Sequence, residues 1–288
     1  MNKLYKYLTP FAGILGRYPH IVLALRYRLA MGRRLERKKP VLWTDKVFWE
    51  SCNTDTSLWS LLADKYLVRD WVKQRCSDDI LTKLYAVYDS ADEIDFSELP
   101  DSFVIKTNNG CASNFLVRNK NETNLEEIRK KLSYWLHFPY GELTGQTHYS
   151  RITPKIIVEE LLIQDNNPEA ALVDYKFYCF NGEPKYCLVI SDRVFGTHKY
   201  SRMIYDMEWR AFPEYFEEGA ELKAAIQPEP FTKMREIAKT LSLGFKYVRV
   251  DMYCIRGRIL FGEMTFMPGM ETKFTKEFQL ELGNLMEN

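Results

Sequence analysis

The chain has 288 residues, 46% of them hydrophobic, and its 40 Lys and Arg against 39 Asp and Glu leave a formal net charge of +1. This composition excludes a disordered or fibrous protein, and no apolar run approaches the roughly 20 residues that span a bilayer. The six cysteines form no CxxC or other metal-binding spacing, so we expect a reduced, cytoplasmic protein without structural zinc or disulfides.

The small net charge conceals an uneven distribution. Residues 1–40 carry ten basic residues and one acidic residue, a charge of +9, and the rest of the chain carries −8. Apolar residues recur at near-helical spacing between Ile21 and Leu35 and predict a helix that ends at Pro40. Its arginines are not confined to one face. We therefore slightly favour a helix packed on the body, with arginines facing acids, over one lying on an anionic membrane or polymer.

Helical and strand patterns then follow in an irregular order. The order is not a regular βαβ alternation, so we expect an α+β fold with antiparallel sheets rather than a Rossmann fold. Two helices are predicted across 55–90, with N-caps at Asp55/Thr56 and Ser77/Asp78. Further helices are predicted at 124–136 and 232–241, strands at 103–105, 115–117, 156–162, 174–180, 185–190, 248–255 and 259–266, and a tight hairpin turn at Asn181-Gly182.

Two acids, Asp251 and Glu263, lie in apolar strand segments on either side of Gly257. A three-residue loop, Arg256-Gly257-Arg258, would place them directly opposite each other, with Cβ atoms about 5 Å apart. A two-residue turn would place them on opposite faces of the sheet. Two facing carboxylates need a cation between them, which favours a Mg²⁺ site. The alternative is an accidental pairing in which one acid faces solvent.

Three further features could serve a nucleotide. Lys106 ends a strand before the polar loop 107–113, whose open backbone N–H groups suit phosphate, although an ordinary Asn-Gly turn fits equally well. The run 159–162 (Glu-Glu-Leu-Leu) ends a buried strand and could contact ribose and adenine, although strand ends are often acidic. Arg249 lies two residues from Asp251, hence on the same face, and is a candidate clamp for a substrate carboxylate or phosphate; the alternative is a surface ion pair.

Several short stretches, taken in order and spacing, match one family. They are 63–69 (ADKYLVR), 99–106 (LPDSFVIK), 157–160 (IVEE), 174–177 (DYKF), 180–185 (FNGEPK), 191–193 (SDR), 248–253 (VRVDMY) and 261–266 (FGEMTF). From about residue 60 to 283 the sequence resembles the ATP-grasp superfamily, and most closely its teichuronopeptide-biosynthesis (TupA-like) branch. Two positions depart from the usual pattern. Thr265 stands where many members have Asn, and the phosphate loop is poorer in glycine.

The resemblance implies an ATP-grasp fold in which two α+β subdomains hold ATP with Mg²⁺. We expect a basic helical leader at 1–50, N-terminal and central subdomains with the phosphate loop at 51–155, and a C-terminal subdomain with the Mg²⁺ hairpin at 156–288. The expected metal ligands are Asp251, Glu263 and Thr265. The expected catalytic residues are Lys106, Lys176, Arg193 and, because of the face it shares with Asp251, Arg249, with Arg202 also near the phosphates or the acceptor. The implied ATP-binding positions are Lys65, Lys106, Asn109, Gly110, Ser113, Glu159, Glu160, Leu161, Leu162, Asp174 and Lys176.

The resemblance also implies an activity. Transfer of the γ-phosphoryl group of ATP to a carboxylate gives an acyl phosphate, which an amine attacks to form an amide. The expected ligase joins an amino acid or amino sugar to a uronic acid of a bacterial surface polysaccharide, as in capsule biosynthesis. It works in the cytoplasm, with residues 1–40 as a candidate contact to the inner face of the membrane and no nucleic-acid partner. The alternatives are a polysaccharide-modifying kinase or glycosyltransferase, and a non-catalytic ATP-binding scaffold.

Overall fold

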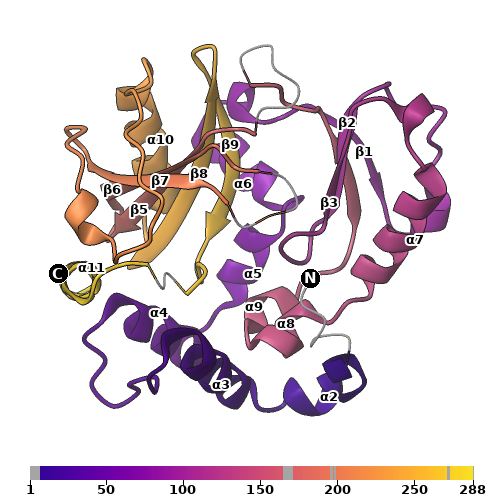
Figure 1. Ribbon diagram of the computed structural model, residues 1–288. Coiled ribbons are helices and arrows are strands. Elements are labelled where there is room, and N and C mark those ends of the chain that lie inside the picture. Colours follow the sequence, from indigo (N-terminus) through magenta and orange to yellow (C-terminus); the bar gives the residue numbers. More distant parts are fainter. Residues whose placement is uncertain (1–6, 165–170, 195–196, 198, 271–272, 288) are drawn as a thin grey trace. The chain divides into compact units, whose positions relative to one another are not determined.

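The computed structural model describes residues 7–164, 171–194, 197, 199–270 and 273–287. The chain forms two compact units. The first comprises Met1–Arg26, Thr54–Arg69 and Thr82–Leu162, and the second Tyr27–Asn53, Asp70–Leu81 and Ile163–Asn288. Helices α3 (Pro19–Met31) and α6 (Val68–Arg75), both labelled in Figure 1, each contribute residues to both units. The subdomain limits expected from the sequence stay a prediction.

The first unit contains a four-stranded antiparallel sheet in the order β1-β4-β2-β3. Alternation along β2 places Phe103 and Ile105 in a core with Ile128 and Leu132 of α7, and leaves Lys106 on the other face. The strands are β1 (Leu84–Tyr88), β2 (Phe103–Thr107), β3 (Asn114–Val117) and β4 (Ile156–Glu159).

The first unit also contains several helices, most of them short. The amphipathic pattern at 124–136 forms α7 as predicted, and the Asn124 side chain caps it by accepting a hydrogen bond from the backbone N–H of Glu127. The helices of the first unit, besides parts of α3 and α6, are the 3-10 helices η1 (Thr9–Phe11), η3 (Ala91–Glu93) and η4 (Lys120–Glu122), and α2 (Ala12–Leu15), α5 (Ser57–Ala63), α7 (Leu125–Leu136), α8 (Tyr140–Thr144) and α9 (Thr147–Ser150).

The second unit contains a five-stranded antiparallel sheet in the order β7-β6-β5-β8-β9. Helix α10 packs on one face, where Phe231 stacks on Phe177 of β5 at a centroid distance of 5.8 Å. Side chains at even-numbered positions of β5, including Lys176, point to the other face. The strands are β5 (Asp174–Phe180), β6 (Glu183–Ser191), β7 (Ser201–Asp206), β8 (Tyr247–Ile255) and β9 (Arg258–Thr265).

That other face is closed at one end by an aromatic cluster. Trp43 of α4 is fully buried and packs against Tyr178 and Tyr247, with centroid distances of 5.5 and 5.4 Å. The remaining helices of this unit are α4 (Trp43–Asn53), η2 (Asp78–Ile80), η5 (Pro213–Tyr215), α10 (Phe231–Ser242) and α11 (Lys276–Leu285). The predicted α+β class with antiparallel sheets is therefore confirmed.

Two predicted elements are wrong in extent or type. The leader helix ends at Met31 rather than Pro40, because Gly32 takes a left-handed conformation (φ 68°) that stops it. Ser77 caps only the 3-10 turn η2, and the expected second helix of 55–90 lies earlier, as α6. The chain instead enters β1 at Leu84, because its pairing with β4 outweighs the local preference for helix.

Candidate functional site

The β8–β9 hairpin brings Asp251 and Glu263 opposite each other, by a route that differs from the expected one. Its turn has two residues, Arg256 and Gly257, both at positive φ (51° and 78°). A regular ladder from that turn would pair Asp251 with Gly262. The register instead shifts between the Asp251 and Met252 pairs, so one extra residue moves Glu263 opposite Asp251. The three-residue loop was wrong, and the facing of the two acids is confirmed.

Gly262 is the extra residue of this bulge, and it has no room for a side chain. A Cβ atom there would lie 3.0 Å from the backbone oxygen of Asp251 and 3.3 Å from the ring of Tyr253. The hairpin therefore combines a two-residue turn with a glycine bulge. Together they place Asp251 and Glu263 opposite each other on the same face of the sheet.

Charged side chains from three neighbouring strands meet beside this pair. We call Asp174, Lys176, Arg249, Asp251, Glu263 and Thr265 the charged row. Lys176 of β5 pairs across the sheet with Asp251, and its Nζ lies 2.5 Å from Asp251 Oδ2 and 3.4 Å from Asp174 Oδ1. Thr265 donates its hydroxyl to Glu263 Oε1 at 2.7 Å. The charged row thus brings carboxylate and hydroxyl oxygens into contact with cationic side chains.

Arg249 contacts three other members of the charged row. Its Nε and Nη2 donate to the two carboxylate oxygens of Asp251, each at 2.7 Å. Nη2 also reaches Glu263 Oε1 at 3.4 Å and the Thr265 hydroxyl at 3.2 Å. The Arg249 side chain is 8% exposed, so the alternative of a surface ion pair was wrong. Its expected position on the face of Asp251 is confirmed.

The electrostatics keep Asp251 and Lys176 ionised. Burial by itself raises the pKa of Asp251, but the charges of Arg249 and Lys176 bring it below its usual value. Burial by itself lowers the pKa of Lys176, but the carboxylates of Asp251 and Asp174 raise it above its usual value. Glu263 is the open end of the row, with a side chain 40% exposed. An incoming cation would meet Glu263 first.

Arg193 extends the row, and Arg202 stands beside it. Arg193 Nη2 lies 3.2 Å from Asp174 Oδ2, which brings it into the expected neighbourhood. The guanidinium groups of Arg193 and Arg202 both lie over the ring of Tyr200, at 5.0 and 4.5 Å from its centroid. Arg202 Nε is buried without a hydrogen-bond partner among the residues described. The row therefore ends in two guanidinium groups sharing one aromatic ring.

The first unit holds a second cluster around Lys106. Lys106 Nζ lies 2.5 Å from Glu159 Oε2, and Arg69 Nη1 lies 3.0 Å from Glu159 Oε1. Glu159, expected at the adenine hinge, is thus a buried counter-ion for two cations. The backbone N–H of Glu160 donates to the Lys83 carbonyl at the strand edge, and Leu161 and Leu162 follow, half-buried. Sequence reasoning missed Arg69, since its partner lies 90 residues away.

The loop after β2 is held by its own side chains. Asn109 donates to the Leu136 carbonyl at 3.3 Å, and Ser113 accepts a hydrogen bond from the Thr107 hydroxyl at 2.8 Å. Lys65 Nζ donates to the Gly110 carbonyl, so two expected phosphate-binding elements are in contact. Because the Asn109 and Ser113 side chains are engaged internally, backbone N–H groups are what this loop can offer a phosphate.

Asp64 is a buried anchor of this loop that the sequence did not reveal. It accepts hydrogen bonds from the backbone N–H of Tyr66 (2.8 Å) and from the Asn108 amide (3.0 Å). Burial raises its pKa, and these hydrogen bonds offset that rise only in part. In the sequence, its position directly before Lys65 was the signal that could have identified Asp64. Asp64 ties the Lys65 segment to the loop.

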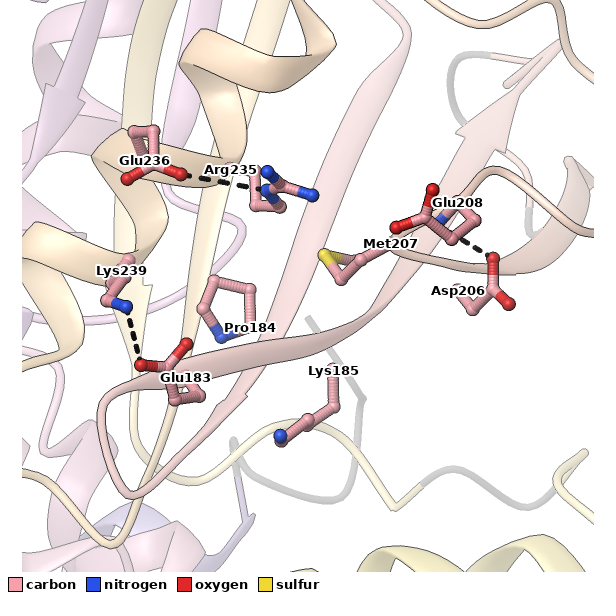
Figure 2. Close-up of a pocket in the computed structure, with 9 residues that line it drawn as sticks. All are labelled: Glu183, Pro184, Lys185, Asp206, Met207, Glu208, Arg235, Glu236 and Lys239. Carbon is pink, nitrogen blue, oxygen red and sulfur yellow. Dashed lines mark hydrogen bonds and ion pairs between the residues drawn. The ribbon is translucent and has the colours of Figure 1, made fainter.

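A separate open pocket of about 440 Å³ lies at the edge of the second sheet, beside α10. Figure 2 shows two of its lining residues, Lys239 and Glu183, directed toward one another, with Nζ and Oε1 2.6 Å apart. Arg235 and Glu236 form a longer pair at 3.7 Å. The pocket shares no residue with the charged row, and its charges are largely matched internally. It offers no reason to move the candidate site away from the row.

Comparison with known proteins gives the following similarities. The L-amino acid ligase of Bacillus licheniformis is 12% identical with a TM-score of 0.50, over 88% of this chain and 55% of that one. The D-alanine–D-alanine ligase of Bacillus anthracis, in complex with ATP, is 13% identical with a TM-score of 0.49, over 79% of this chain and 64% of that one. This chain therefore spans less than two thirds of the length of either ligase.

The first of these similarities shows the fold, and no curated protein matches. The family model described as TupA-like ATPgrasp matches residues 45–287, which include both clusters but not the basic residues of 1–40. The likeness predicted from short stretches of sequence is thereby confirmed over most of the chain. The chain belongs to the TupA-like ATP-grasp family.

Proposed function

We propose that this protein is an ATP-dependent ligase that joins a carboxylate to an amine. The observation that carries the proposal is the charged row, where the two facing acids Asp251 and Glu263 lie beside Lys176 and Arg249. Membership of the ATP-grasp family supports the nucleotide, and the row supplies what phosphoryl transfer needs: oxygen ligands for a cation and positive groups for phosphate.

The residues of the row fit Mg²⁺ in a nucleotide complex. Among the described residues, no group of three or more His, Cys, Asp or Glu side chains is arranged to hold a metal. Mg²⁺ is commonly held by one or two carboxylates together with substrate phosphates, so two acids and one hydroxyl are sufficient. Asp251, Glu263 and Thr265 would hold the ion, which when bound neutralises charge on the transferring phosphoryl group.

The cations of the row have a matching role. Arg249 and Lys176 balance Asp251 when no ion is bound, and they would turn toward phosphate oxygens when Mg²⁺ takes over that carboxylate. Arg193, 39% exposed, is free to reorient toward the acceptor carboxylate. In the first unit, Lys65, Lys106 and the backbone of 109–113 would receive phosphates, and 159–162 the base and ribose. No covalent nucleophile is required.

We further propose that the carboxylate belongs to a uronic acid of a bacterial surface polysaccharide, and the amine to an amino acid or amino sugar. The family assignment supports this choice, and residues of the row support only a carboxylate. We place the reaction in the cytoplasm, where ATP is available. All six cysteines are free in the structure.

The test is ADP release by the full chain with ATP and Mg²⁺, screened over pairs of uronic acids and amino acids, with mass detection of the product. A conjugate one water lighter than the sum of its two components, formed with equimolar ADP, supports the ligase. A phosphorylated sugar without conjugate would make the protein a kinase. Product formed from a nucleotide sugar without ATP would make it a glycosyltransferase.

A further inference from the structure

An exposed apolar stripe runs along the start of the chain. In residues 7–31 the large apolar side chains that recur every three or four positions are all more than half exposed, from 52% to 74%. This spacing places the three that lie in α3, Ile21, Leu25 and Leu29, on one side of that helix, and the other four lie on the short helices and the turn before it. The stripe, which we call the leader stripe, consists of Tyr7, Phe11, Ile14, Tyr18, Ile21, Leu25 and Leu29.

The leader stripe is not the surface that holds these helices in place. The other side of α3 is already packed, with Leu23 1% exposed and lying against Gly145, and Tyr27 fully buried against Phe48. Ala12 of α2 packs in the same way against Phe138. An apolar helix that buries one face and exposes the other has a second contact still to make, because isolated exposed residues are normal but a continuous row is not.

The charge around the stripe is of one sign. The first acidic residue of the chain is Glu36, so no carboxylate of the leader interrupts the stripe. Arg17 and Arg28 are exposed, and Arg28 lies within one turn of Leu25 and Leu29 on the same side of α3. Within residues 7–35 the structure shows one ion pair, between Arg33 and Asp45. The surface therefore combines apolar side chains with uncompensated positive charge.

This combination favours one kind of partner. A second copy of the chain would bring like-charged arginine rows together, which is unfavourable. The 13-residue helix α3 is too short to cross a bilayer, and no helix in the described part of the chain is long and apolar enough to do so. Apolar side chains beside arginines, with tyrosines along the row, are typical of helices that lie in the plane of a membrane surface.

We infer that residues 7–31 dock on the surface of an anionic lipid bilayer. The leader stripe enters the boundary between headgroups and acyl chains, and Arg17 and Arg28 contact lipid phosphates. This goes beyond the proposed ligase activity, since the leader lies before the segment matched by the family model. It adds to the preference drawn from the sequence: α3 packs on the body and Arg33 faces an acid, Asp45, while Arg17 and Arg28 face solvent.

The test uses the full chain and vesicles of phosphatidylcholine with phosphatidylglycerol, or of phosphatidylcholine alone, in a sedimentation assay. The variant carries Ile21→Gln, Leu25→Gln and Leu29→Gln, all at exposed positions. We expect its binding to the anionic vesicles to fall about tenfold or more, since three aliphatic side chains no longer partition. The matched control is Ile226→Gln, at a side chain 92% exposed outside the leader, and it should bind as the wild type does.

A second variant, Arg17→Gln with Arg28→Gln, should lower binding to anionic vesicles and flatten its dependence on salt. The inference is overturned if the wild type does not bind anionic vesicles, or if the triple variant binds them like the wild type. It is also overturned if the triple variant only converts a concentration-dependent dimer to monomer in ultracentrifugation, with vesicle binding unchanged. Circular dichroism of each variant checks that the fold is retained.

Discussion

Asp251 and Arg249 form a buried ion pair in the charged row. The arginine satisfies both carboxylate oxygens, and both side chains are almost fully enclosed. Such a pair is a poor source of net stability, but removing one partner leaves a buried charge uncompensated. The same arrangement holds the pKa of Asp251 below its usual value and so keeps it ionised.

This leads to a prediction about unfolding. Arg249→Ala should lower the free energy of unfolding by about 3 kcal/mol or more, because Asp251 then keeps only Lys176 as counter-ion. Arg193→Ala, whose ion pair is 39% exposed on the arginine side, should cost less than about 1 kcal/mol. Urea unfolding of both variants measures the difference. Equal losses would contradict the expectation that removing the partner of a buried carboxylate costs more than removing an exposed one.

A second prediction at this scale concerns His148 of α9. Burial lowers its pKa to about 3, and its Nδ1 has no hydrogen-bond partner among the described residues. The unfolded chain takes up this proton near pH 6.5 and the folded chain only near pH 3. The stability contributed by neutral His148 is therefore complete above about pH 6.5 and is lost as the pH falls toward 3, by at most about 1.4 kcal/mol per pH unit.

The comparison that isolates this group is His148→Phe. This variant should lose less stability than the wild type between pH 6.5 and pH 4 in urea titrations. The same substitution at the exposed His137 is the matched control. Identical pH slopes for wild type and His148→Phe would contradict the assignment.

At the scale of the element, the β8–β9 hairpin sets the geometry of the site. With a two-residue turn alone, Glu263 would lie on the opposite face of the sheet from Asp251. The bulge at Gly262 shifts the register by one residue and brings Glu263 to the face of Asp251. Gly262→Val should therefore disturb the acid pair and lower the rate of Mg²⁺-dependent ADP release by about tenfold or more, since small displacements of reacting groups are costly. Gly269→Val, at a glycine where an added Cβ would meet nothing within 4 Å, is the control and should retain activity.

Some elements could be predicted from local sequence, and others could not. Helix α7 has its cap and its apolar period within 13 residues, and the β5–β6 turn is indicated by Asn181-Gly182. Strand β1 was missed because its stability comes from pairing with β4, some 70 residues later. Gly262, inside the strand pattern of β9, was the sign in the sequence that a bulge occurs there. The pairing of Asp251 with Glu263 was predicted correctly although the predicted turn was one residue too long.

The same limit applies to the candidate site. The faces of Asp174, Lys176, Arg249 and Asp251 follow from strand alternation, which needs only the sequence. That Glu159 is the counter-ion of Lys106 and Arg69 depends on three segments far apart in the chain. The local sequence pattern could therefore predict which charged residues lie at the site, but it could not predict which of them form ion pairs with each other.

At the scale of the whole molecule, the central expectation is that nucleotide and metal bind together to the folded chain. ATP with Mg²⁺ at a hundred times the dissociation constant should raise the free energy of unfolding by about 2.7 kcal/mol. Removing the metal with EDTA should reverse most of this gain, since Asp251 and Glu263 would no longer be bridged to phosphate. Thermal unfolding with and without EDTA provides the measurement; a gain insensitive to EDTA would argue against the metal site.

The most direct measurement is ADP release coupled to mass detection of the conjugate, comparing wild type with Asp251→Asn. Glu183→Gln, a surface acid on the same sheet, serves as the matched control. We predict that wild type and control form ADP and an amide conjugate in equal amounts with Mg²⁺, and that Asp251→Asn forms neither while retaining the folded circular dichroism spectrum. Undiminished ADP release by folded Asp251→Asn would contradict the account.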